Sequence, residues 1–225
     1  MTTIAVIGTG RVGSALGPRL ASLGHRVIYG TRSPERADVV ELVATSGASA
    51  AAKSVAEAAA EADWIVVATP HSAMQNVATE IGNADGKLII DVTNALVPAG
   101  DGLMQLDDGG SAGEAWQAAM PGAHVVKAFS TVGYHIMANP ELAGGPVTTM
   151  LIGDNAEAKE TVAGLAADLG FESADLGPMR NARYLEGVAV LYLVPLLTGR
   201  RDEAFEFYLR KGIGTDPSIK VRVPE

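Results

Sequence analysis

Short apolar segments alternate along this chain with segments in which apolar residues recur at helical spacing. The apolar segments predict buried strands at 3–8, 26–30, 48–52, 63–70, 87–94, 124–130, 148–153 and 171–177. The segments between them predict helices at 12–23, 34–45, 53–60, 72–81, 114–119 and 155–169, with a glycine-rich loop at 100–113. Strands that alternate with helices favour a parallel sheet with right-handed crossovers. The pattern therefore predicts an α/β fold of the Rossmann type, with a doubly wound, mostly parallel sheet.

The pattern changes after residue 177, where helical sequence takes over. We predict a Rossmann domain over residues 1–177 and a C-terminal helical extension over residues 178–225, which includes a helix at 201–211. The most apolar stretch, 187–199, is too short to span a bilayer and contains a proline. Its apolar residues surround the helix, which predicts burial between the sheet and the second subunit of a homodimer. These residues are Val188, Val190, Leu191, Leu193, Leu196 and Leu197.

A glycine-rich segment follows the first predicted strand and opens the first predicted helix. It consists of Gly8, Thr9, Gly10, Arg11, Val12 and Gly13, and it matches the pattern G-x-G-x-x-G. Glycines at these positions permit a tight turn, the approach of a pyrophosphate to the backbone, and close packing of helix on strand. The N–H groups at the helix start are then available to phosphates. The six residues are therefore the predicted binding site for a dinucleotide.

The end of the second predicted strand indicates which dinucleotide binds. NAD enzymes usually place an acidic residue there, because its carboxylate accepts hydrogen bonds from the ribose 2′-OH. This chain has Thr31 and Arg32 instead, with Arg36 one turn into the next predicted helix. Arginine can hold a phosphate through two parallel hydrogen bonds. These three residues predict a site for a 2′-phosphate, and hence NADP(H) as the cofactor.

Polar residues also follow three later strands, at the edge of a parallel sheet where ligands bind. The residues expected along the nicotinamide half of the cofactor are Thr69, Pro70, His71, Asn94, Lys127 and Ala128. His71, Ser130 and Thr131 are the candidate catalytic residues, because a carbonyl or imine substrate would need a proton donor. Lys127 lies inside an apolar strand, so a structural ion pair and a proton-donating role both stay open for it. His135 stays open as a substrate contact.

The composition argues against several other kinds of protein. A net charge of −9 disfavours nucleic acid as a partner, since phosphate contacts need a basic face. The chain has no Cys residue, which removes disulfide and thiolate chemistry and suits a reducing cytoplasm. The four His residues lack metal-ligand spacing with acidic partners, so no metal site is expected. We expect a cytoplasmic protein without a membrane segment, because strand-like sequence starts at Thr2.

Four segments resemble the NADP-dependent deazaflavin-coenzyme (coenzyme F-420) reductase family. They are "IAVIGTGRVGSALGPRLASLGHRVIYGTRSPE", "DVTNAL", "VVKAFST" and "DLGPMRNARYLEGVAVLY", and the resemblance covers nearly the whole chain. The chain is also similar to the cytoplasmic reductase domains of the six-transmembrane metalloreductases. The resemblance implies a dimer and a 2′-phosphate site at Thr9, Thr31, Arg32 and Arg36. It further implies a hydride acceptor packed on the nicotinamide near Pro70, Asn94 and Ser130.

The nature of the second substrate follows from the hydride chemistry and from the charge of one insertion. We predict an NADP(H)-dependent oxidoreductase whose small-molecule acceptor is a deazaflavin or flavin ring, in which case no strong acid is needed. The acidic insertion at 99–117 fits an anionic deazaflavin poorly. One alternative is a reductase of small carbonyls or imines, and another is a non-catalytic protein that senses NADP(H). The polar residues expected in the cleft favour an enzyme.

Overall fold

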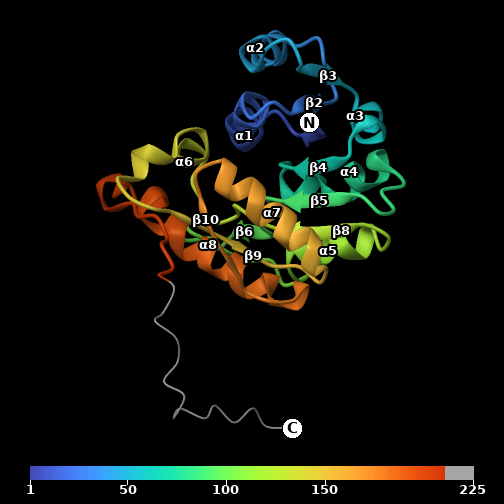
Figure 1. Cartoon of the computed structure of the whole chain (residues 1–225). Helices are drawn as coiled ribbons and strands as arrows, with labels where there is room; N and C mark the ends of the chain where they lie inside the picture. Colours follow the sequence, from blue (N-terminus) through green and yellow to red (C-terminus); the bar gives the residue numbers. More distant parts are fainter. Residues whose placement is uncertain (211–225) are drawn as a thin grey trace, which may run out of the picture.

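A six-stranded parallel sheet forms the centre of the molecule in the computed structural model, which describes residues 1–210 (Figure 1). In spatial order its strands are β3 (Ala51–Lys53), β2 (Arg26–Gly30), β1 (Thr3–Ile7), β4 (Trp64–Val67), β5 (Leu88–Asp91) and β8 (His124–Lys127). Successive strands are added in one direction from β1 to β3 and in the other direction from β4 to β8. The loops that follow β1 and β4 therefore diverge at this point. The predicted Rossmann-type fold is confirmed.

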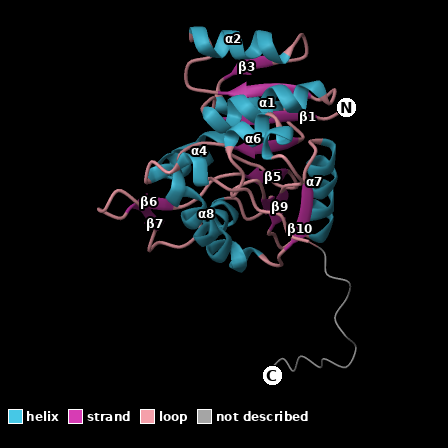
Figure 2. Cartoon of the chain, turned by 90° about the vertical axis from the view of Figure 1, so that its left-hand side faces the viewer, coloured by secondary structure: helices cyan, strands magenta, loops and turns pink. Residues whose placement is uncertain are grey.

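Helices cover both faces of this sheet, because successive side chains of each strand point in opposite directions. In β1, Ile4 and Val6 join the apolar cluster on one face, whereas Ala5 and Ile7 join the cluster on the other. The first face packs against α1 (Arg11–Ser22), α2 (Ala37–Ser46) and α7 (Ala156–Asp168). The second face packs against α3 (Val55–Glu61), α4 (Met74–Ile81) and α5 (Ala112–Ala119). Figure 2 shows α4 and α7 on opposite sides of β5.

A smaller parallel pair extends the sheet beyond β8. It consists of β9 (Thr148–Leu151) and β10 (Glu172–Asp175). An antiparallel bridge joins it to β8, in which the N–H of Lys127 donates to the carbonyl of Ile152 at 2.8 Å. Both strands occur where the apolar pattern predicts them. In the described chain, the strand pairs of the extended sheet are parallel and only this bridge is antiparallel, so the extended sheet is mostly parallel, as predicted.

Two local predictions are wrong, and one short helix is missing from the prediction. The loop expected at 100–113 contains β7 (Met104–Leu106), which pairs with β6 (Leu96–Pro98) as an antiparallel hairpin. Helix α2 begins at Ala37 rather than residue 34, because the preceding residues form a turn in which the N–H of Arg36 donates to the carbonyl of Ser33. The short helix α6 (Tyr134–Ala138) was not expected at all. Strands of three residues and helices of five give too little periodicity to recognise.

The C-terminal part of the described chain is built around α8 (Ala182–Leu197), which packs against α5 and β7. The helix predicted at 201–211 is wrong, since only a 3-10 turn forms at Arg201–Glu203. Residues 204–210 are not helical, because they bind β9 instead: the N–H of Thr148 donates to the carbonyl of Phe207 at 2.8 Å. The rest of the predicted extension, 211–225, lies outside the described residues, and the division at residue 177 stays a prediction.

One side of α8 faces the core and the other faces solvent. Leu185, Ala189 and Tyr192 are buried, whereas Tyr184 is 76% exposed and Leu191 is 62% exposed in the single chain. Burial of the exposed side by a second subunit therefore stays a prediction. Within residues 1–210, no helix is both long enough and apolar enough to cross a membrane.

Candidate functional site

The glycine-rich turn after β1 has the geometry that a dinucleotide needs. Gly8 has a φ of 107°, and a Cβ there would lie 2.6 Å from the carbonyl oxygen of Ala68. A Cβ at Gly13 would collide with the carbonyl of Gly8, so the helix can approach the turn only because residue 13 has no side chain. A Cβ at Gly10 would meet nothing within 4 Å, so this glycine borders open space. The turn leaves room for a ligand against the backbone.

The N-terminus of α1 is left without a side-chain partner. Gly10 is the N-cap, no side chain accepts hydrogen bonds there, and the first turn contains no acidic residue. The first N–H groups of a helix need an acceptor from outside it, and they carry the positive end of the helix dipole. A phosphate at this point would supply that acceptor. The residues present therefore fit a pyrophosphate.

The loop after β2 lies against the glycine-rich turn. The Arg36 guanidinium donates to the hydroxyl of Thr9 at 3.3 Å and also to the carboxylate of Asp38 at 2.8 Å. The Arg36 hydrogen bond holds the pKa of the Asp38 carboxyl below its usual range. Arg32 is exposed, and within the described chain no carboxylate lies within ion-pair distance of its guanidinium. Thr31 is half-buried beside it. The residues predicted to bind the 2′-phosphate thus lie around one loop. Asp38, which was not predicted from the sequence, lies beside them and holds Arg36.

A cavity of about 580 Å³ opens at the carboxyl end of the sheet, between α1 and α8. The sheet side is formed by the loops that follow β5 and β8, and the opposite wall comes from α6, α8 and the segment after it. Its polar and aromatic lining residues are Arg11, Asn94, Phe129, Ser130, Tyr134, His135, Tyr192 and Arg201. No carboxylate among residues 1–210 lines it, although the chain carries a net charge of −9. The described lining thus contains two arginines and no carboxylate, and the nearby carboxylate of Glu206 lies next to two of the lining residues, Tyr192 and His135.

Several polar side-chain atoms around this edge have no hydrogen-bond partner within the described structure. They include Thr69 Oγ1, His71 Nδ1, Asn94 Oδ1 and Ser130 Oγ. Buried polar atoms nearly always have partners, so a group of such atoms indicates a missing ligand or water. All four follow β4, β5 or β8. Thr69, His71 and Asn94 were predicted at the nicotinamide half of the cofactor, and Ser130 was predicted as a candidate catalytic residue. The residues present fit the polar carboxamide of a nicotinamide.

The loop after β8 holds Ser130 in an unusual backbone conformation. Phe129 has a φ of 58°, the only non-glycine residue in the described chain with a positive φ. Its N–H donates to the hydroxyl of Thr149 at 2.7 Å, which fixes the turn from outside. Ser130 then lines the cavity, whereas Thr131 is only 2% exposed and does not line it. A left-handed non-glycine residue is costly, and such strain is often found at functional sites.

His71 begins a 3-10 turn at the end of β4, outside the cavity lining. Its Nε2 lies 3.8 Å from Oδ2 of Asp107, which follows β7. The acidic insertion thus folds into a hairpin that brings a carboxylate to this histidine. The N–H of Asp107 donates to the carbonyl of Ala95, so the pair also borders the loop of Asn94. Catalytic roles for His71, Ser130 and Thr131 stay predictions.

Lys127 lies at the end of β8 and is completely buried, as is Ala128. The lysine ammonium lies 2.7 Å from Asp91 and 2.9 Å from Glu186, both also completely buried. Burial acts to lower the pKa of this ammonium, but the two carboxylates offset burial and raise it above its usual value. Of the two roles that the sequence left open for Lys127, the structure shows the ion pair. A direct cofactor contact by Lys127 or Ala128 stays a prediction.

A cluster of polar side chains at the cavity wall, formed by Tyr192, Glu206 and His135, was not predicted from the sequence. The hydroxyl of Tyr192 donates to Oε1 of Glu206 at 2.9 Å, and Nε2 of His135 lies 4.0 Å from the same oxygen. Burial raises the pKa of the Glu206 carboxyl, and Tyr192 and His135 offset this only in part. Burial also raises the pKa of the Tyr192 phenol, and Glu206 adds to the effect. No local signal marked Glu206, because it lies in a segment expected to be helical.

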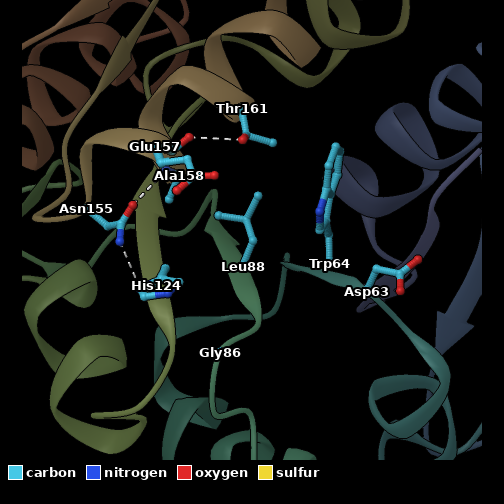
Figure 3. A pocket seen from close by; sticks show the side chains of 9 residues that line it. All are labelled: Asp63, Trp64, Gly86, Leu88, His124, Asn155, Glu157, Ala158 and Thr161. Atoms are coloured by element: carbon cyan, nitrogen blue, oxygen red, sulfur yellow. Dashed lines mark hydrogen bonds between the residues drawn. The ribbon is translucent and has the colours of Figure 1, made fainter.

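A second hollow, of about 280 Å³, lies at the opposite end of the strands, where β4, β5 and β8 begin (Figure 3). Asn155 caps α7 there and contacts the His124 ring at 3.3 Å, and Thr161 donates to the carbonyl of Glu157. Ligands of open parallel sheets bind at the carboxyl ends of strands, and this hollow is at the amino ends. It is separate from the candidate site. Within residues 1–210, no group of three or more His, Cys, Asp or Glu side chains could hold a metal.

The fold and the site together define a dinucleotide-binding protein of the Rossmann class, and known proteins are similar to it along most of the chain. Residues 3–95 match the family described as NADP oxidoreductase, coenzyme F420-dependent. The F420-dependent NADP reductase of Methanothermobacter marburgensis is 29% identical over 205 residues, which cover 84% of this chain and 90% of that protein. A crystal structure from Arthrobacter sp. FB24, provisionally named an F420-dependent NADP reductase, has a TM-score of 0.85 and 31% identity, covering 94% of this chain and 100% of that chain.

The chain belongs to the coenzyme F420-dependent NADP oxidoreductase family and is an NADP-dependent oxidoreductase. Metalloreductase STEAP3 of Rattus norvegicus is also similar, with 27% identity over 194 residues and 84% of this chain covered. The match spans 37% of the length of that relative. The resemblance predicted from the four sequence segments is therefore confirmed at the level of the family.

Proposed function

We propose that this enzyme transfers a hydride between NADP(H) and a ring acceptor of the deazaflavin or flavin type. The observation that carries the proposal is the cavity beside the glycine-rich turn, which is lined by two arginines and a histidine and by no carboxylate in the described chain. A flat acceptor with an anionic tail suits such a lining. The names of the relatives from Methanothermobacter and Arthrobacter support the same acceptor class.

In this proposal three groups of the predicted cofactor residues bind three different parts of the dinucleotide. The turn at 8–13 and the start of α1 hold the pyrophosphate, because their N–H groups are without side-chain partners. Thr31, Arg32 and Arg36 hold the 2′-phosphate. Thr69, Asn94 and Ser130 bind the nicotinamide carboxamide through their unpartnered atoms.

The protein contributes orientation and a dry environment rather than covalent chemistry. NADPH supplies the hydride, and the ring that accepts it needs no strong acid beside it. Phe129 and Val92 give the sheet side of the cavity an apolar lining, and Leu193 and Leu196 do the same on the α8 side. Water exclusion by such walls strengthens the polar contacts that remain.

One observation favours the alternative, a reductase of small carbonyls or imines. His71 and Asp107 form a histidine–carboxylate pair at the edge of the site. A carboxylate beside an imidazole can orient its ring, and a general acid has to be held in a fixed orientation. Against this, His71 does not line the cavity, so it would have to reach the substrate by a side-chain movement.

The experiment that separates the two functions is oxidation of NADPH by the purified protein with a matched panel of acceptors. The panel contains a deazaflavin, a free flavin, small ketones and cyclic imines. The proposal expects turnover with the ring acceptors and little with the others. Turnover confined to ketones or imines would support the alternative, and no turnover with any acceptor would contradict both.

We also propose that the enzyme is a homodimer in which the outer side of α8 is covered. Tyr184 and Leu191 lie about two turns apart on that side and are exposed in the single chain, with 76% and 62% of their surface accessible. Exposed apolar side chains grouped along one helix support an interaction surface.

A further inference from the structure

Asn94 and Ser130 lie in the loops after β5 and β8, which are called the nicotinamide loops below. Three fully buried charged side chains lie next to these loops, and the hydride transfer proposed above makes no direct use of them. They are Asp91 at the end of β5, Lys127 at the end of β8 and Glu186 in the second turn of α8. We infer that this trio is a positioning unit, which fixes Asn94 and Ser130 toward the nicotinamide and ties α8 to them. The inference rests on the proposed NADP(H) site.

Each charge in the trio has specific partners. The Lys127 ammonium donates to the carbonyl of Thr93 at 2.6 Å and lies at ion-pair distance from Oδ2 of Asp91, 2.7 Å, and from Oε1 of Glu186, 2.9 Å, although Oδ2 of Asp91 makes no hydrogen bond of good geometry within the described structure. Oδ1 of Asp91 accepts from the N–H and the hydroxyl of Thr93, at 2.8 and 2.6 Å. A Cβ at Gly113 would lie 3.1 Å from the lysine side chain, so the glycine lets α5 approach it. Removing one partner from such a buried ion pair leaves a charge without compensation, so the three side chains hold one another in place.

The trio holds the backbone on both sides of Asn94. On one side, Lys127 binds the carbonyl of Thr93. On the other side, Oε2 of Glu186 accepts the N–H of Ala95 at 2.8 Å. Asn94 is thus fixed at its two neighbours. Its own side chain donates to the carbonyl of Ser130 at 2.9 Å and leaves Oδ1 without a partner within the described residues.

The same unit reaches Ser130 through β8. Lys127 is the last residue of β8 and lies three residues before Ser130, and between them the chain makes the left-handed turn at Phe129. A displaced Lys127 would therefore move the start of that turn. Asn94 and Ser130 are joined to each other by a hydrogen bond, so both loops respond together.

Glu186 extends this control to the opposite wall of the cavity. Besides Ala95 it accepts the N–H groups of Ala112 and Gly113, at 3.1 and 3.3 Å, so it also caps α5. The following turns of α8 carry Ala189 and Tyr192, which line the cavity. This assigns a role to the glutamate of the segment "DLGPMRNARYLEGVAVLY", one of the four segments that resemble the family. Glu186 sets the distance between the acceptor wall and the nicotinamide loops.

The test uses Glu186→Gln in the full chain. A glutamine has one acceptor oxygen, so it cannot serve both Lys127 and the N–H groups of Ala95 and α5. Two ligands are titrated: NADPH, and adenosine 2′,5′-bisphosphate, which lacks the nicotinamide half. We expect NADPH binding to weaken by about fivefold or more and adenosine 2′,5′-bisphosphate binding to change by less than about twofold, since only the nicotinamide loops have moved. Turnover at saturating NADPH should fall about tenfold or more, because small displacements at a reacting centre are costly.

Two further variants make the result specific. Lys87→Met is the matched control, since Lys87 also donates to three backbone carbonyls, of Ala59, Ala60 and Ala62, but at the opposite edge of the sheet. It should lower the melting temperature and leave both affinities and turnover unchanged. Asn94→Ala should weaken NADPH binding as Glu186→Gln does, and the double variant should be no worse than Asn94→Ala alone, because coupled residues are not additive.

The inference is overturned if Glu186→Gln lowers the melting temperature but keeps the ratio of the two affinities, or if its effect adds to that of Asn94→Ala. Asp91→Asn, which leaves Lys127 paired with Glu186, is measured in the same way if Glu186→Gln does not fold. Failure of both variants to fold would assign the trio to stability alone and reject the inference. The affinity ratio needs no acceptor, so it is independent of the acceptor panel, whose failure would show already in the unmodified protein.

Discussion

The Arg36 guanidinium donates to the Thr9 hydroxyl at 3.3 Å and so connects the loop after β2 to the glycine-rich turn after β1. The connection closes one side of the place where the adenosine end of a dinucleotide would lie. Arg32 belongs to the same loop after β2; it is exposed and has no ion-pair partner in the described chain. The two arginines therefore differ: Arg36 is already engaged, and Arg32 is available.

Arg32→Ala should weaken NADP(H) binding by about tenfold or more, because a charge-assisted hydrogen bond to phosphate contributes about 1.5–3 kcal/mol. NAD(H) binding should hardly change, and in the unmodified protein NADP(H) should bind at least about tenfold more tightly than NAD(H). Fluorescence titration of both nucleotides measures this. Arg26→Ala is the control, since Arg26 pairs with Glu61 at the other end of β2. Equal affinities for NADP(H) and NAD(H) would contradict the 2′-phosphate site.

Asp38→Asn should tighten NADP(H) binding by about two- to threefold, the size typical of one exposed ion pair. The Asp38 carboxylate now holds the Arg36 guanidinium and would repel a 2′-phosphate. Titration at low and at high salt checks the electrostatic origin, because the gain should shrink as salt screens the charges. Glu41→Gln, which removes an exposed charge from the same helix, should have little effect. Weaker binding by Asp38→Asn would mean that Asp38 orients Arg36 usefully.

His71→Ala should lower turnover with a deazaflavin or flavin acceptor by less than about tenfold, because hydride transfer between rings needs no acid. If the substrate is a carbonyl or imine and His71 is the acid, the loss should approach about 10²–10⁴-fold. Asp107→Asn should then reproduce part of that loss, since Asp107 is the carboxylate beside the imidazole. Steady-state rates at saturating NADPH decide between the two. A large loss with a ring acceptor would contradict the proposed role of the protein.

Glu206→Gln should stabilise the protein at neutral pH. The pKa of Glu206 is raised in the folded state, so its contribution to stability is complete below about pH 4.3, the unfolded value, and is lost as pH rises through the folded pKa. The melting temperature of the variant minus that of the unmodified protein should therefore increase from acid to neutral pH. Glu203→Gln, at an exposed pair with Arg200, should show no such trend. A difference that is constant with pH would argue against the buried carboxylate as its cause.

Leu191→Glu should convert a dimer to a monomer, because it places a charge on the exposed apolar side of α8. Light scattering at micromolar concentration measures the mass. Leu142→Glu is the control, since Leu142 is similarly exposed, at 65%, but lies in the 3-10 turn after α6. An unmodified protein that is already monomeric would reject the proposed dimer.

Much of the fold was predictable because its signals are local. The strand at 3–8, the glycine-rich turn and the helix after it follow one another within a short segment, so periodicity and glycine spacing identify them together. The interpretation of Arg32 uses a local signal of the same kind, its place after β2, and stays a prediction. The hairpin of β6 and β7 was missed, because strands of three residues show almost no alternation.

Parts of the site were not predictable because they depend on residues that are distant in sequence. Asp107 meets His71 only through the hairpin, and Glu186 reaches Lys127 only through the packing of α8. Phe207 looked helical from its neighbours, but its backbone binds β9 instead. Such a segment can form a helix or bind to the edge of a strand. The local sequence does not determine the choice, because it depends on whether a strand with free hydrogen-bonding groups lies nearby in the folded chain.

The ion pair between Lys127 and Glu186 has a consequence for the order in which the protein can be built. A chain is synthesised from its N-terminus, and domains generally fold in that order. When β8 has emerged from the ribosome, Lys127 can meet Asp91, but Glu186 has not yet been made. Until α8 follows, the lysine lacks its second carboxylate, and the N–H groups of Ala95 and the start of α5 lack the side-chain acceptor that Glu186 provides in the folded chain. The nicotinamide loops should therefore become ordered only late in synthesis, when the last helix docks.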